Sequence, residues 1–295
     1  MPAPSGQRDA IHDIGYRHYD GPRLGRRAVQ RALLLDSARG AYGLGRAGRT
    51  KIVPVLLLAA MCLPAVIVSI VASVIGAAQL PLNYTAYSTT LATLVVVFVA
   101  TQAPASVSRD LRFRVVSLYF SRPMQRVDYV QAKFAGLALA VLAFLAAPQL
   151  LLLAGALLAE MPLREQLPDL ARALAGAVVL SLVLAGVGLV LAAATPRRGL
   201  GVAAIITVLV VLSGVQAAVL GISLERGADT AAGWSGLLQP FTLVDGAATL
   251  LGAEATLPPG PPGTAGALVF AAVALALVAA CYVLLVLRYR KVSVS

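Results

Sequence analysis

Few residues in this 295-residue chain have the types and spacing that support catalysis or metal binding. The two histidines, His12 and His18, both lie near the start of the chain, and no HExxH motif or cysteine cluster occurs. A catalytic or metal-binding site needs several such side chains to converge. Cys62 and Cys281 fall inside apolar stretches, where small core residues are expected. We therefore predict no catalytic residue, no metal site and no cofactor.

One motif resembles a phosphate-binding loop, a G-x-G-x-x-G pattern over residues 43–48 that continues into Arg49 and Thr50. Such a loop must follow a β-strand and open a helix, so that backbone N–H groups face the phosphates. Here a basic helical pattern precedes the motif and an apolar stretch follows it. Arg49 also stands where a Walker A motif requires lysine. We predict no nucleotide site, and hence no ATPase within this chain.

Apolar stretches long enough to cross a bilayer make up most of the chain. A spanning helix needs about 20 mostly apolar residues, and 59% of this sequence is hydrophobic, with a mean hydropathy of +0.84. We predict an all-α polytopic membrane protein with six transmembrane helices. Residues 1–51 are predicted to form a cytoplasmic arm, and residues 52–295 a single transmembrane domain. The predicted spans are Ile52–Ile75, Tyr87–Ala103, Phe134–Ala159, Leu170–Ala194, Gly201–Leu220 and Gly266–Leu287.

The basic residues lie mostly on one side of these spans. Of the 24 Lys and Arg residues, 21 lie in residues 1–51, 109–133, 197–198 and 288–291. Only Arg164, Arg172 and Arg226 lie on the other side. Cytoplasmic connections carry an excess of Lys and Arg, so both termini are predicted to be cytoplasmic. The net charge of +11 then indicates a membrane surface and not a nucleic-acid partner, because the charges flank spans.

The arm contains a predicted amphipathic helix between Leu24 and Tyr42. Its arginines, Arg27, Arg31 and Arg39, lie off an apolar stripe. Such a helix lies in the headgroup plane with its arginines on anionic lipid. A helix packed on a partner is the alternative. The stripe consists of Leu24, Ala28, Ala32, Leu35 and Tyr42.

The connection after the second predicted span is long and charged. Ser106 or Ser108 is suited to cap the N-terminus of a short helix, with Asp110 in its first turn. Arg122-Pro123 would end that helix, and Asp128 would start the next one. A projecting helix with exposed charges suits the docking of a soluble partner.

Two glutamines and one outer segment are candidates for a path across the membrane. Gln149 and Gln216 are expensive to bury in a span, and no span has a carboxylate at its middle, which argues against a proton-coupled carrier. The stretch Trp234–Leu251 is too apolar for a free loop, and Pro240 interrupts it. We predict short helices that dip into the outer leaflet, with Trp234, Phe241 and Leu243 as an outer gate or, alternatively, a structural plug.

Three segments carry a resemblance to a known family. Ser121-Arg122-Pro123, followed by Arg126, Asp128-Tyr129 and Lys133 before an apolar span, resembles the segment after the second span of type-2 ATP-binding-cassette (ABC) transporter permeases of the bacterial export class. The runs over residues 11–23 and 239–246 also resemble actinobacterial members.

The resemblance implies a permease subunit in the bacterial cytoplasmic membrane, which pairs with a second permease subunit and two separately encoded ATPase subunits. The resemblance also implies that the chain alone is not an enzyme, because the partner subunits hydrolyse ATP. The alternatives are a membrane-embedded lipid-modifying enzyme, whose Asp-rich metal motifs are missing here, and a non-transporting scaffold or sensor subunit. The resemblance assigns contact with the ATPase to Arg109, Asp110, Arg112, Phe113, Arg114 and Tyr119.

Overall fold

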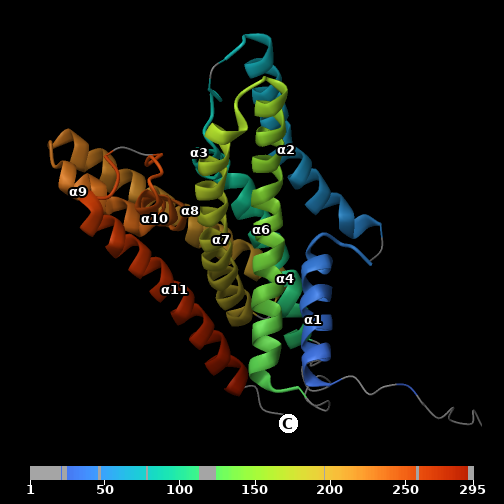
Figure 1. Ribbon diagram of the computed structural model, residues 1–295. Helices are drawn as coiled ribbons and strands as arrows, with labels where there is room; N and C mark the ends of the chain where they lie inside the picture. The colour runs from blue at the N-terminus through green and yellow to red at the C-terminus, as the bar shows by residue number, and fades with distance from the viewer. Residues whose placement is uncertain are drawn as a thin grey trace, which may run out of the picture.

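The computed structural model of the chain describes residues 21, 25–45, 48–77, 79–112, 124–195, 197–256 and 259–291. These residues form helices and connections, with no β-strand among them, as the sequence predicts. The α-helices are α1 (Arg26–Ala41), α2 (Arg49–Val74), α3 (Tyr84–Thr90), α4 (Ala92–Arg112), α6 (Arg126–Leu158), α7 (Leu163–Ala194), α8 (Arg198–Glu225), α9 (Asp229–Trp234), α10 (Pro240–Ala248) and α11 (Gly263–Lys291) (Figure 1). Two 3₁₀ turns, η1 (Ser235–Leu238) and η2 (Thr249–Leu251), flank α10.

Five of the described helices are long and apolar enough to cross a membrane, namely α2, α6, α7, α8 and α11. They coincide with five of the six predicted spans. The remaining prediction, Tyr87–Ala103, corresponds to α3 and α4, whose axes meet at 64°. The described chain therefore has five spans, or six if this bent pair crosses as one. Either count makes it a multi-pass membrane protein.

Threonine side chains accompany the break between α3 and α4. The hydroxyls of Thr89 and Thr90 each donate to the carbonyl of Ala86 at 2.8 Å, and α3 ends at Thr90. Hydroxyl groups that bond to the preceding turn in this way bend helices. After the bend, Thr85, Ser88 and Thr89 of α3 border an internal cavity, whereas Thr90 is exposed.

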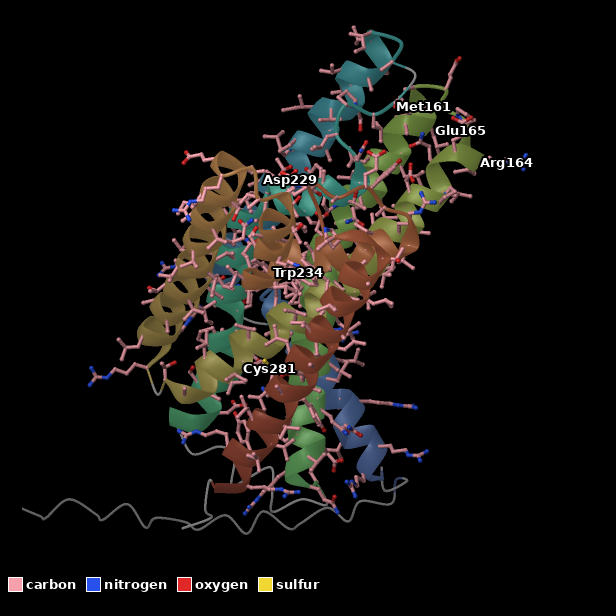
Figure 2. All side chains as sticks on the ribbon, turned by 90° about the vertical axis from the view of Figure 1, so that its left-hand side faces the viewer. Met161, Arg164, Glu165, Asp229, Trp234 and Cys281 are labelled. Carbon is pink, nitrogen blue, oxygen red and sulfur yellow. The ribbon has the colours of Figure 1, made fainter. Side chains whose placement is uncertain are left out.

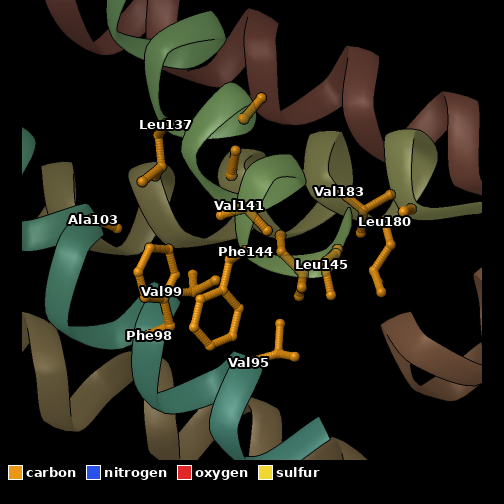
Figure 3. Packing of buried hydrophobic residues seen from close by; sticks show 14 of the residues in the cluster. Val95, Phe98, Val99, Ala103, Leu137, Val141, Phe144, Leu145, Leu180 and Val183 are labelled. Carbon is orange, nitrogen blue, oxygen red and sulfur yellow. The ribbon is translucent and has the colours of Figure 1, made fainter. Parts of the chain in front are cut away.

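The core forms where α4, α6 and α7 meet (Figure 3). Phe98 of α4 stacks on Phe144 of α6 with ring centroids 4.3 Å apart, and both side chains are fully buried. Val183 of α7 is also fully buried in this cluster. Helices α1 and α2 lie on one side of α6, and α8 and α11 lie beyond α7 (Figure 1). The outward faces of α2, α8 and α11 stay apolar and exposed, at Leu56, Val210 and Leu275 for example, as lipid contact requires.

Helix α1 runs beside the first half of α6 (Figure 1). The Tyr42 hydroxyl donates to the carbonyl of Ala140 at 2.7 Å, and a Cβ placed on Gly136 would lie 2.6 Å from the Cβ of Ser37. The two backbones therefore approach closely through small residues. Leu35, from the predicted apolar stripe, is 49% exposed and does not belong to this contact. The buried residues of α1 are Leu33, Ser37, Gly40 and Ala41.

The two ends of the bundle differ in composition. At one end, here called the basic end, α1 begins, α4 ends, α6 begins and α11 ends. The other end, the opposite end, holds the turn from α6 to α7, with Met161, Arg164 and Glu165 (Figure 2). The start of the first described helix and the end of the last one therefore both lie at the basic end.

Candidate functional site

At the basic end, the end of α4 is joined to the start of α6 by an ion pair. Lys133 Nζ lies 2.9 Å from Asp110 Oδ2, and the Tyr129 hydroxyl donates to the same oxygen at 2.7 Å. Lys133 Nζ also donates to the carbonyl of Ser106 at 2.9 Å and lies 5.6 Å from the centre of the Tyr129 ring. The side chains of Lys133 and Asp110 are only 9% and 17% exposed. Every charge in this group therefore has a nearby partner, as burial demands.

A second ion pair joins α1 to the first turn of α6. Arg26 holds Asp128 in a two-point contact, with Nε at 2.6 Å from Oδ2 and an Nη at 2.7 Å from Oδ1. Asp128 Oδ2 also accepts from the backbone N–H of Gln125 at 2.9 Å, so the carboxylate caps α6 as well. Bidentate contacts of this kind are strong and fix orientation. The predicted start of this helix is therefore two residues late: α6 begins at Arg126, and Asp128 lies in its first turn.

Helix α11 joins the same group through its last turns. The Arg126 guanidinium donates to the carbonyl of Arg290 at 2.8 Å, and the rings of Tyr129 and Tyr289 lie 5.1 Å apart. Four helices, α1, α4, α6 and α11, therefore meet at the basic end. We call this group of residues the basic-end cluster, made of Arg26, Asp110, Arg126, Asp128, Tyr129, Lys133 and Tyr289.

The structure corrects one prediction about the connection after the second span. Ser106 and Ser108 do not cap a separate short helix, because α4 runs unbroken through both residues to Arg112. The Ser108 hydroxyl instead donates to the carbonyl of Ala192 in α7 at 3.3 Å. The helix continues because its apolar face is still covered by α6 and α7 at this point.

The predicted ATPase-contact residues have different surroundings. Asp110 faces α6, where Lys133 and Tyr129 hold it, so its carboxylate serves an internal contact. Arg109 and Arg112 lie on the last turn of α4, and nothing is described of their side chains. Phe113, Arg114 and Tyr119 lie outside the described residues.

Towards the opposite end, Gln149 lines a small cavity of about 30 Å³ between α3, α6, α7 and α10. Gln149 is 1% exposed, and its amide oxygen has no hydrogen-bond partner among the described residues. It follows Pro148, which lacks the N–H that would bond to the preceding turn, so α6 is locally weakened here. The other lining residues are Thr85, Ser88, Thr89, Ala173, Gly176, Ala177, Leu180, Phe241, Val244, Asp245 and Ala248.

Gln216 of α8 lines a second cavity, of about 20 Å³, on the other side of α10. Asp245 lines both cavities, so the same carboxyl group borders the cavity of Gln149 and the cavity of Gln216. Its oxygens accept hydrogen bonds from the backbone N–H and the hydroxyl of Thr256, at 2.8 and 2.7 Å. Burial raises the pKa of Asp245 above its usual value.

Sequence reasoning missed Asp245 as a candidate. In the sequence it is a single acidic residue in an apolar outer stretch, and the family resemblance of the run 239–246 assigns no role to it. The only available signal is its place four residues after Phe241, on the same side of a short helix as an expected buried residue. That signal becomes informative only when the position of α10 against α3, α7 and α11 is known.

The predicted outer gate residues are ordered and packed. Phe241 and Leu243 are each 2% exposed, on opposite sides of α10. Trp234 stacks on Phe270 of α11 with ring centroids 6.1 Å apart. In Figure 2, Trp234 lies farther from the opposite end of the bundle than Asp229, which starts α9. Helix α10 begins at Pro240 after Gln239, whose side chain accepts from the N–H of Thr242.

An open polar cleft of about 300 Å³ lies beside this region at the opposite end. Its charged residues are Glu165, Asp169, Arg172 and Glu254, three acids and one base. Arg172 pairs with Asp169 at 2.7 Å and donates to the carbonyl of Leu251 at 2.8 Å. Thr85 lines both this cleft and the cavity of Gln149, so the two spaces adjoin.

Among the described residues, no three His, Cys, Asp or Glu side chains are grouped as a metal ion would need. A scan against protein-family models matches nothing in this chain, and a search of curated proteins matches nothing either. The family resemblance therefore rests on the three sequence segments named above, and the geometry of the site must support any function assigned to it.

Proposed function

We propose that this chain is the membrane-spanning permease subunit of an ATP-driven ABC exporter. In this proposal it lies in the bacterial cytoplasmic membrane with both termini inside the cell, and it pairs with a second permease subunit. Separate ATPase subunits bind the basic end, which is the cytoplasmic end. The chain forms the translocation path and hydrolyses no ATP itself.

The observation that best supports this proposal is the anchoring of the two helix ends that precede and follow residues 113–123. On one side, Asp110 ties the end of α4 to Lys133 of α6 at 2.9 Å. On the other side, Arg26 ties the start of α6 to α1 through Asp128. A connection that transmits the motion of a soluble partner to the spans must have stiff attachments, since a loose one would absorb the motion locally. The basic-end cluster supplies such attachments on both sides.

The path in this proposal runs between the polar groups around α10. Gln149 and Gln216 lie on opposite sides of this helix, and Asp245 of α10 borders the cavities of both. Cavities of about 30 and 20 Å³ are too small for most cargo, so α10 must move for transport. Phe241 and Leu243 hold α10 in place, which is the role expected of an outer gate.

The coupling role is tested by a paired charge reversal. We expect Arg112→Glu with Arg114→Glu to leave the chain inserted and folded, but to reduce co-purification of the ATPase and vanadate-sensitive ATP turnover by tenfold or more, on the order of 1.4 kcal/mol or above. The matched control is Arg164→Glu with Arg226→Glu, which makes the same charge change at the opposite end. Equal ATPase binding and turnover in the two double variants would refute the coupling role.

The gate is tested by Phe241→Ser with Leu243→Ser in reconstituted vesicles. We expect altered export with ATP binding by the complex retained. Leu250→Ser with Leu251→Ser is the control, because these residues are 40% and 53% exposed. Unchanged export in the first variant would leave α10 a structural plug.

A further inference from the structure

Among the described residues, no basic side chain is paired with the carboxyl group of Asp245. Within the described part of the chain, no Lys or Arg forms an ion pair with it, and its only hydrogen-bond donors come from Thr256. Arg172 is the basic residue of the adjacent cleft, and it pairs with Asp169. A partly buried carboxylate in an apolar environment is costly unless a positive charge compensates it.

The cavity beside Asp245 supplies further oxygen ligands. Gln149 contributes a fully buried amide oxygen that no described donor satisfies. Thr85, Ser88 and Thr89 contribute hydroxyls from α3, the short half of the broken helix. In membrane transporters, broken helices and neutral oxygens commonly surround sites for small cations.

The number and charge of these ligands select the class of cation. A divalent ion such as Ca²⁺ takes six to eight oxygens at roughly 2.3–2.6 Å, usually with several carboxylates. Here a single carboxylate and neutral oxygens line a cavity of about 30 Å³. One unit of positive charge balances one carboxylate, so the site suits a small monovalent cation.

The cavity also has an approach from the opposite end. Thr85 borders both the cavity and the open polar cleft, whose three acids outnumber its one arginine. An acidic cleft raises the local concentration of cations. The cation can therefore approach Asp245 through the cleft, which adjoins the cavity at Thr85.

We propose that Asp245, Gln149, Thr85 and Ser88 form a binding site for one small monovalent cation such as Na⁺. The cation holds α10 against α3 and α6, because its ligands come from all three helices. This inference goes beyond the proposed function, since it requires neither an ATPase nor a cargo.

The site is tested by sodium binding to the purified full-length chain in a sodium-free choline buffer. We expect radioactive sodium to bind saturably, at about one ion per chain. Trp234, the one tryptophan in the chain, packs beside the second Asp245 cavity, so its fluorescence should change over the same sodium range. Failure of the wild-type chain to bind sodium would overturn the proposal.

Three variants separate this site from non-specific binding. Asp245→Asn keeps the shape of the side chain but removes its charge, and should abolish saturable binding. Gln149→Leu should weaken binding by about tenfold or more, as loss of a ligand typically does. Asp229→Asn removes an exposed acid from α9 and should bind like the wild type. Equal binding by the Asp245→Asn variant would place the ion elsewhere and refute the assignment.

Discussion

Replacing Lys133 with Met should destabilise the basic end strongly, because it removes one member of a largely buried pair. The Nζ–Oδ2 distance of 2.9 Å corresponds to roughly 6 kcal/mol of attraction at an effective dielectric constant near 20. Desolvation of both groups cancels much of this attraction. The variant, however, leaves the Asp110 carboxylate without its counter-charge and the Ser106 carbonyl without its donor. We expect a loss of about 3 kcal/mol, the lower end for a broken buried pair, since Asp110 is still 17% exposed.

A double-mutant cycle isolates the pair itself. Asp110→Asn should cost a similar amount, about 3 kcal/mol, because it leaves the Lys133 ammonium without its counter-charge, although the amide keeps one hydrogen bond to Tyr129. The double variant should cost less than the sum of the two single variants, with a coupling energy near 2 kcal/mol. The measurement is denaturant unfolding of the purified full-length chain, and Lys51→Met is the control because Lys51 is exposed.

Two results would refute this reasoning. A coupling energy below about 0.5 kcal/mol would show that the two side chains act independently. A Lys133→Met variant as stable as Lys51→Met would show that solvent replaces the pair at little cost, as at an exposed site.

Three further predictions concern the orientation, the packing and the pH response of the chain. A cysteine introduced at Gly227 should react with an impermeant reagent from outside intact cells, and one at Ser295 only after permeabilisation; labelling of Ser295 from outside would reverse the topology. Gly246→Ala should place a methyl group against the ring of Phe270, loosen α10 and speed its hydrogen exchange; Phe270→Leu in the same chain should restore slow exchange. Burial raises the pKa of Asp245, so the folded chain binds the proton of this group more tightly than the unfolded chain does. In sodium-free buffer, the free energy of unfolding should therefore fall as pH rises from about 4 through the raised pKa of Asp245. Asp245→Asn should flatten that part of the stability curve, and an unchanged slope would show that another group titrates.

The spans follow from the sequence because the bilayer acts on each segment separately. About 20 apolar residues satisfy their backbone hydrogen bonds only as a helix in lipid, whatever surrounds them. For this reason α2, α6, α7, α8 and α11 each contain a predicted span nearly whole, although α6 and α7 begin well before theirs, at Arg126 and Leu163. The start of α10 is similarly local, since Gln239 and Pro240 form a cap and a first turn by themselves.

Which residues of one helix contact another depends on how both helices pack, so neither segment determines these contacts alone. The predicted apolar stripe of α1 includes Tyr42, which contacts α6, but it omits Ser37, whose small side chain lets the two helices approach closely. Ser106 and Ser108 were interpreted as helix caps, whereas α4 continues through them under the cover of its neighbours.

The sequence by itself determined that the chain is helical, multi-pass and markedly asymmetric in charge, because hydropathy and charge act residue by residue. Only the tertiary structure decided which polar groups meet. It brought Asp110 to Lys133 across 23 positions of sequence and Arg26 to Asp128 across 102. It also placed Asp245 beside the cavity of Gln149, almost a hundred residues earlier in the chain. The physical reason is that buried polar groups take their partners from whichever helices packing makes adjacent, and packing depends on all the helices together.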